Sequence, residues 1–182
     1  MTIAPCAPTA LRPVLVAQRH RDPAHHHVTL SRGVAARLTL DGTPVDATHL
    51  HQLGLTMHQA WDAAACNLVR LAQFPLGTRF MTRPASCLDP GLRGAAQVDT
   101  PGADPTAWLA HPYSFSVLHK HLTSLCRGVE PAYIVVRPGV LLCSPLPVRT
   151  TVLARCATLA AEAGELPSLG PLIYRHGFAS LE

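Results

Sequence analysis

The sequence predicts an α+β fold, a mainly antiparallel sheet with three principal amphipathic helices packed on it. Three observations predict it. Helical apolar patterns alternate with short strand-like runs, and signals for hairpins outnumber those for long crossovers, which favours antiparallel pairing. The composition, 48% hydrophobic and 14% charged over 182 residues, is that of a packed chain. Disordered proteins are excluded, because they are poor in apolar residues and rich in charge.

The chain is expected to open with a loosely ordered arm and to continue as one α+β domain. Residues 1–27 are rich in proline and end in three consecutive histidines, so order is expected to begin at residue 28 and to extend over 28–182. The arm has room for one strand at 11–18. In the domain, alternating apolar residues up to Asp41-Gly42 predict a β-hairpin over residues 28–40.

The first principal helix is expected over residues 56–73, after a short helical turn at 48–53. Thr56 and Gln59 form a capping box at its start. Apolar residues from Trp61 onward recur with the helical period and predict one core-facing stripe.

A strand at 78–82 is expected next. It is followed by a long loop at about 83–104 with room for one short strand at 95–98, because this stretch is rich in proline and glycine. Loops of that length are functional or mobile in most compact domains. Asp104-Pro105 begins a short helix, and Ser114 is expected to cap the second principal helix, over residues 115–127.

The C-terminal part is predicted to hold a buried hairpin and the third helix. The runs 132–137 and 140–143 flank Pro138-Gly139, the pair that a type II turn requires. Pro147 fits the first position of a helix that reaches about residue 163. A last strand is expected at 172–174.

Charge and hydropathy exclude several classes of partner. The formal charge of +4 comes from scattered basic residues, so nucleic acid is not an expected partner. A membrane is not expected either, because no apolar run approaches the roughly 20 residues of a span. The first residues do not resemble a secretion signal, so we expect a soluble, cytoplasmic protein. The six cysteines include no C-x-x-C pair, which favours buried thiols over a zinc or redox motif.

Eleven histidines make metal binding the first functional hypothesis to test. His25, His26 and His27 can wrap Ni²⁺ or Zn²⁺, and adventitious affinity is favoured because a proline-flanked arm offers no supporting partners. His58 and Asp62 are four residues apart on one helix face, where they ligate an ion or form a solvated pair. The solvated pair is favoured in the absence of an H-E-x-x-H motif, and no cofactor is predicted.

A small hydrolase or transferase with a pocket lined by histidine and cysteine is the enzymatic alternative. Its candidate residues lie on elements expected to be neighbours, namely His111, Tyr113, His119, His121 and Cys143. No nucleophile elbow, dinucleotide fingerprint or Walker sequence accompanies them.

The sequence therefore favours a non-catalytic binding protein that self-associates as a homo-oligomer or binds a protein partner. The low charge leaves apolar surface available for an interface. The hydrolase or transferase is the first alternative, and transition-metal binding through histidines is the second.

Overall fold

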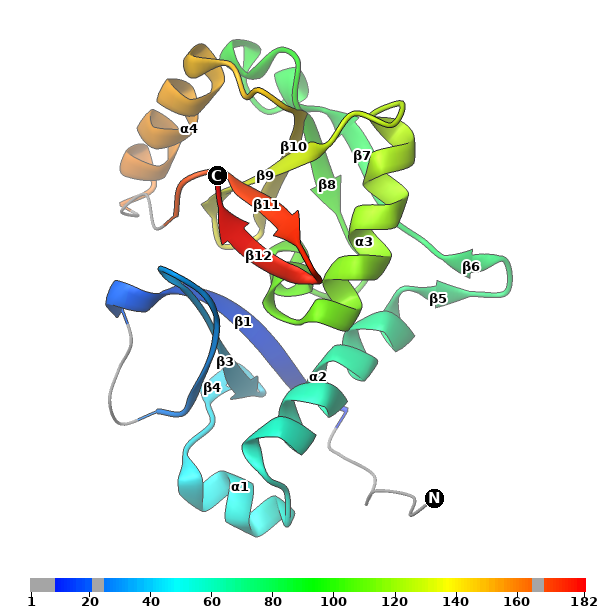
Figure 1. Cartoon of the computed structure of the whole chain (residues 1–182). Coiled ribbons are helices and arrows are strands. Elements are labelled where there is room, and N and C mark those ends of the chain that lie inside the picture. The colour runs from blue at the N-terminus through cyan, green and yellow to red at the C-terminus, as the bar shows by residue number, and fades with distance from the viewer. Residues whose placement is uncertain (1–8, 21–24, 165–168) are drawn as a thin grey trace.

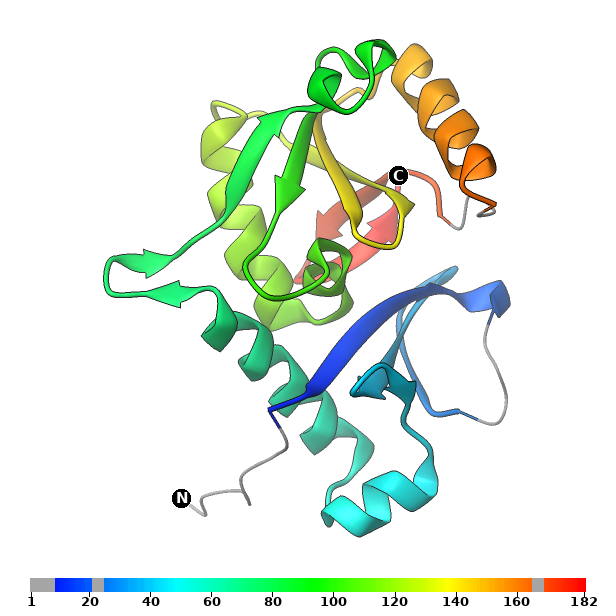
Figure 2. The same cartoon turned by 180° about the vertical axis from the view of Figure 1, so that it is seen from behind.

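The computed structural model describes residues 9–20, 25–164 and 169–182, and it confirms the α+β class. Within these residues, two antiparallel sheets lie one above the other in Figure 1, with four α-helices around them and a small hairpin projecting at one side. The reverse view shows the same two layers (Figure 2).

The N-terminal sheet is built around its third strand. Its strands are β1 (Leu11–Ala17), β2 (His27–Ser31), β3 (Val34–Leu40) and β4 (Thr43–Pro44), with the 3₁₀ turn η1 (Gln18–His20) after β1. β3 pairs with β1 on one side and β2 on the other. The β2–β3 hairpin is as predicted. Asp41-Gly42, with φ of 50° and 82°, forms the tight turn into β4.

The strand expected at 11–18 is present as β1, and it is paired within the N-terminal sheet rather than loosely held. The whole strand pairs with β3, from Leu11 opposite Leu40 to Ala17 opposite Val34. Leu11 is fully buried. Residues 1–8 and 21–24 of the expected arm lie outside the described residues.

Two helices follow, α1 (Ala47–Leu53) and α2 (Met57–Leu71). The capping box of Thr56 and Gln59 is present at the start of α2, as predicted, and Gly54 in the left-handed region ends α1. The apolar stripe of α2 is buried and includes Trp61 and Leu68. α2 packs on β1 with this stripe.

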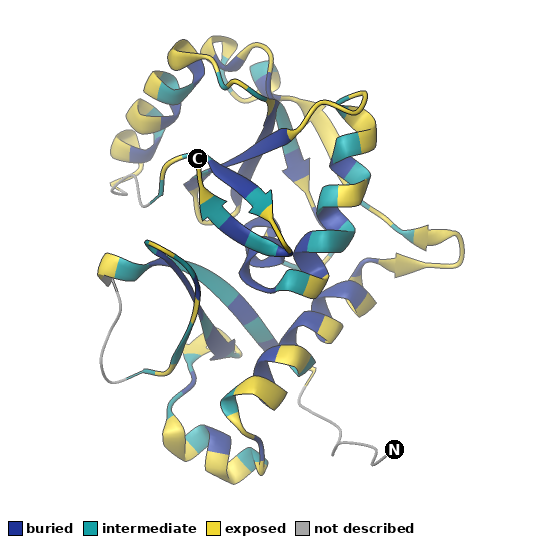
Figure 3. Cartoon of the chain, viewed as in Figure 1, coloured by how far each residue is buried: buried dark blue, intermediate teal, exposed yellow. Residues whose placement is uncertain are grey.

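The second sheet has six strands in the order β12-β11-β9-β10-β8-β7. Their bounds are β7 (Met81–Pro84), β8 (Ala96–Asp99), β9 (Pro131–Arg137), β10 (Val140–Pro145), β11 (Leu172–Arg175) and β12 (Phe178–Leu181). The β9–β10 hairpin is the predicted one, with Gly139 at φ 78°. Both strands are buried on both faces (Figure 3).

The short strand expected at 95–98 is present as β8, and the rest of the stretch 83–104 is more ordered than its prolines and glycines predict. The whole stretch holds the end of β7, the 3₁₀ turns η2 (Ala85–Cys87) and η3 (Pro90–Leu92), and β8. Asp89 explains part of this order, because its carboxylate accepts from the Gly91 N–H and forms an ion pair with Arg155 at 2.7 Å. Each element is too short for a periodic pattern.

The remaining helices are α3 (Pro112–Leu125) and α4 (Thr150–Glu162), and both start at residues other than those predicted. Ser114 is not the cap of α3, because its hydroxyl is buried and donates to the carbonyl of Trp108, while the His111 side chain caps the helix. α4 begins at Thr150 rather than Pro147, with Arg149 as its N-cap.

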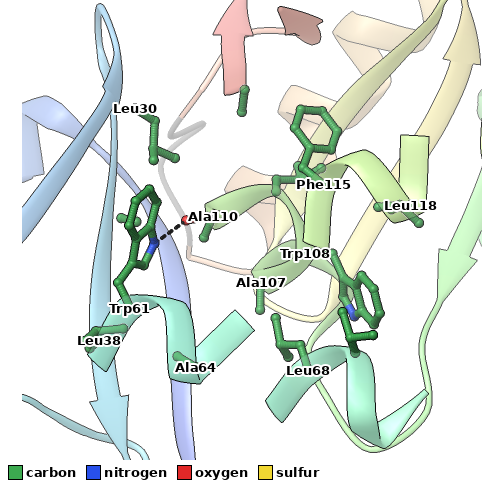
Figure 4. Close-up of a cluster of buried hydrophobic side chains, with 14 of the residues drawn as sticks. Leu30, Leu38, Trp61, Ala64, Leu68, Ala107, Trp108, Ala110, Phe115 and Leu118 are labelled. Carbon is green, nitrogen blue, oxygen red and sulfur yellow. Dashed lines mark hydrogen bonds between the residues drawn. The ribbon is translucent and has the colours of Figure 1, made fainter. Parts of the chain in front are cut away.

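The main core lies between the two sheets, around the 3₁₀ helix η4 (Pro105–Ala110). All six residues of η4 are buried. Trp108 and Phe115 lie on one side of this core in Figure 4, and Trp61 reaches it from the other, donating from Nε1 to the Ala110 carbonyl at 2.8 Å. A second cluster lies between the six-stranded sheet and α4.

Helices long and apolar enough to cross a lipid bilayer do not occur within residues 9–20, 25–164 and 169–182.

Candidate functional site

His111 joins the start of α3 to the first half of α2. Its Nδ1 accepts from the Tyr113 N–H at 3.0 Å, which makes the ring an N-cap. Nδ1 must therefore be unprotonated, so Nε2–H donates to the Asp62 carboxylate at 3.0 Å. The ring also packs on Trp61, with centroids 4.2 Å apart.

Both nitrogens of His111 are thus occupied, and the ring has no lone pair left to act as a general base. Burial lowers its pKa, and the hydrogen bond to Asp62 opposes this shift. The neutral form that caps the helix is the favoured one. The arrangement is a structural use of histidine, and Asp62 pairs with His111 rather than with His58, contrary to the predicted His58–Asp62 pair.

His119 lies in the middle of α3 within an aromatic cluster. Its ring stacks on Tyr174 with centroids 4.1 Å apart and planes inclined by 9°. A hydrogen bond of 2.9 Å joins its Nδ1 to the hydroxyl of Tyr133. Burial lowers the pKa of His119 and raises that of Tyr133, so both groups favour their neutral forms.

Cys143 lies directly opposite Tyr133 in the β9–β10 pair. Its Sγ is 3.9 Å from the Sγ of Cys126 at the end of α3. Burial, and then the neighbouring Cys126, raise the pKa of Cys143, so the thiol form is favoured over the nucleophilic thiolate. Both cysteines line a cavity of about 380 Å³ at the end of the sheet.

His121 faces a different region, because it is on the other side of α3 from His119. Its ring lies 5.1 Å from that of Phe80, and burial lowers its pKa. The two side chains line a hollow of about 600 Å³ together with the segment from Phe74 to Arg79.

The five predicted pocket residues therefore lie in separate surroundings. His111 contacts α2, His119 contacts the β9 and β11 strands, His121 contacts Phe80, and Cys143 contacts Cys126. Tyr113 is exposed, and only its backbone N–H meets another candidate. Each of these side chains contacts structural neighbours, and the structure does not bring a cysteine and a histidine of the set together as a nucleophile and its base. The enzymatic hypothesis stays a prediction.

The predicted metal ligands do not form a cluster either. Over residues 9–20, 25–164 and 169–182, no group of three or more His, Cys, Asp or Glu side chains is arranged to hold an ion. His27 is part of β2, with its Nδ1 2.8 Å from the His25 carbonyl, and His26 is exposed beside it. His58 contacts the edge of Trp61.

The most exposed apolar surface belongs to a hairpin that the sequence analysis missed. It consists of β5 (Gln73–Phe74) and β6 (Gly77–Thr78), and it projects beyond α3 in Figures 1 and 2. Leu76 at its tip is 104% exposed and Phe74 is 42% exposed. We call the hairpin, the hollow beside it and Met81 the hairpin surface. Its signal in the sequence is an apolar leucine in a turn, between Pro75 and Gly77.

Comparison with known proteins adds no family or relative: no family model matches the chain, and neither the curated proteins nor the solved structures include a match.

Acidification is expected to lower the free energy of unfolding. Burial lowers the pKa values of His111, His119 and His121 from the ordinary 6.5, so the unfolded chain binds more protons than the folded one at mildly acidic pH. This stability is fully present above the unfolded pKa and is lost as the pH falls from about 7 to 5. Urea unfolding followed by circular dichroism across this range measures the slope.

The variant His111→Asn keeps a capping side chain and is expected to reduce this pH dependence. His51→Asn is the control, because His51 is exposed on α1. A free energy of unfolding that rises on acidification, or an unchanged slope in His111→Asn, would contradict the assignment.

Proposed function

We propose that this protein is a non-catalytic binding protein that self-associates through the hairpin surface. The observation that carries the proposal is the complete exposure of Leu76 at the end of a projecting hairpin. Apolar surface left in water costs about 25 cal/mol per Å², so burial of this tip against another molecule is favourable. Contiguous apolar patches of this kind mark interaction surfaces.

A second copy of the chain is the partner that the shape supports. A two-fold interface must be self-complementary, so one patch has to offer both a projection and a recess. The hairpin surface has both, since Leu76 projects at the hairpin tip and the hairpin residues, Leu76 included, line the 600 Å³ hollow together with Phe80 and His121. Two copies related by a two-fold axis can each insert a hairpin tip into the hollow of the other.

Charge and backbone geometry support the same arrangement. The segment 73–80 carries one charged side chain, Arg79, whose guanidinium lies 5.4 Å from the centroid of the Phe74 ring. A centre poor in charge is typical of buried interface cores. β7, which follows the hairpin, is an outer strand of the six-stranded sheet. Its open backbone edge extends the contact area available to the partner.

The expected result is a dimer that the variant Leu76→Ser weakens. Burying a leucine side chain contributes about 1.5–3 kcal/mol, and two symmetric tips are lost at once, so the dissociation constant is expected to rise by about 100-fold or more. Sedimentation velocity over a wide concentration range measures it. The fold is expected to be unchanged, because Leu76 makes no core contact in the described chain.

Val129→Ser is the matched control. Val129 is 45% exposed in the turn between α3 and β9, away from the hairpin. It should leave the dissociation constant unchanged. A wild-type chain that stays monomeric at high concentration would contradict self-association, and an equal effect of the two variants would contradict the assigned surface.

A further inference from the structure

Two cysteines that are separate in the sequence meet in the fold. Cys126 is the C-terminal cap of α3, and Cys143 belongs to β10, between β9 and β8. Their Sγ atoms are 3.9 Å apart. A disulfide requires the two sulfurs to approach to about 2.05 Å, a movement within reach of small side-chain rotations at a helix end.

The pair differs from the other described cysteines in both geometry and access. Cys66 and Cys87 are exposed on α2 and η2, and Cys156 is buried in the cluster under α4. Cys126 is half-buried, Cys143 is 3% exposed, and both line the cavity of about 380 Å³. A small reagent that enters this cavity meets Cys126 with Cys143 directly behind it.

The rest of the cavity has the character expected of a site for a small neutral oxidant. Its walls include the apolar side chains of Leu122, Leu125 and Ala95, with Arg83 at the β7 side. The burial that holds Cys143 as a thiol keeps it from reacting first. Cys126 is thus the first thiol to react with the oxidant, and Cys143 is the thiol that then reacts with oxidised Cys126.

We propose that Cys126 and Cys143 form a redox-modification site, at which hydrogen peroxide converts the two thiols to an intramolecular disulfide. In the first step the sulfur of Cys126 attacks one peroxide oxygen, the O–O bond breaks, and a sulfenic acid and one water form. In the second step the sulfur of Cys143 attacks the sulfenic sulfur. The S–S bond forms, the S–O bond breaks, and the thiol proton leaves with hydroxide as a second water. The two cysteines together lose two electrons, and peroxide gains them.

The disulfide would fasten the C-terminal end of α3 to the centre of the six-stranded sheet. It closes the chain segment that contains the turn after α3 and the whole of β9. This segment carries Tyr133, which pairs with His119 of the same helix. Oxidation is therefore expected to raise the melting temperature, and dithiothreitol should reverse the change.

The test is peptide mapping of the full-length chain treated with hydrogen peroxide at about 10 µM protein. Trypsin places Cys126 in residues 121–127 and Cys143 in residues 128–149, because the Arg137-Pro138 bond resists cleavage. The expected product is these two peptides joined, with the loss of two hydrogens. Because the two sulfurs are held together, their effective concentration is millimolar or more, so this link should form about 100-fold faster than links between molecules.

Two variants separate this site from general thiol oxidation. In Cys66→Ser/Cys87→Ser the joined peptide is expected at an unchanged rate. In Cys143→Ala the sulfenic acid of Cys126 lacks its partner and should proceed to sulfinic acid. If Cys143→Ala fails to fold, the wild-type map decides alone. Sulfinic acid at Cys126 beside an unmodified Cys143, or oxidation of Cys66 and Cys87 while the pair stays reduced, would overturn the proposal.

Discussion

Replacing Trp108 with alanine is expected to lower the free energy of unfolding by about 3–5 kcal/mol, as for other fully buried tryptophans. Trp108 is 0% exposed and lies between the two sheets, on the buried 3₁₀ helix η4. The rings of Trp108 and Phe80 pack edge to face, with their centroids 4.8 Å apart. Loss of the indole leaves a cavity that this rigid setting cannot close. Urea titration monitored by circular dichroism measures the change.

A comparison of Trp108→Phe with Trp61→Phe separates the contribution of packing from that of hydrogen bonding. In the part of the chain that the structure describes, the Nε1 of Trp108 is buried without a hydrogen-bond partner, whereas Nε1 of Trp61 donates to Ala110. Trp61→Phe therefore leaves a carbonyl unpaired and is expected to cost about 1–2 kcal/mol more than Trp108→Phe. The reverse order would show that the indole of Trp108 makes a polar contact in solution.

The second large effect is expected at the beginning of the chain. Leu11→Ala should cost about 2–5 kcal/mol, because Leu11 is 0% exposed and belongs to the main core. Val14→Ala, at a half-buried position of the same strand, should cost about 1 kcal/mol or less. Chemical denaturation of both variants measures the difference. Near-zero effects for both would show that residues 11–17 are a loosely held arm after all.

Local signals in the sequence predicted the elements whose ends are set by neighbouring residues. The capping box of Thr56 and Gln59 acts within one turn of helix, so its pattern is readable before the fold is known. The same is true of the Pro138-Gly139 turn, where φ at the glycine selects the residue. The α+β class follows from these local pieces.

Features that depend on distant partners were missed. The sequence indicated a strand at 11–18 but placed it in a loosely ordered arm, whereas β1 pairs with β3 along its whole length. The cap of α3 has the same origin, because His111 becomes an acceptor at Nδ1 only when Asp62 of α2 holds the proton on Nε2. Tertiary contact decides both cases, and no window of sequence contains them.

The candidate sites follow the same division. Spacing could not select the pair Cys126 and Cys143 from the other cysteines, since a helix end and a strand centre meet only through the sheet order. The sequence showed Leu76 as an apolar residue in a turn that follows a helix, but it gave no sign that two short strands, β5 and β6, hold this turn out as a hairpin. The exposure of a turn residue depends on what the rest of the chain leaves uncovered.

The position of η4 makes the two layers of the molecule one cooperative unit. The clustered apolar residues of the N-terminal sheet all belong to the main core around η4. The six-stranded sheet contributes to this core and also to a second cluster under α4. Among the described residues, the N-terminal layer thus shares its interior with the other layer. Opening of the seam around η4 would expose both layers at once, so local unfolding there and global unfolding are the same event.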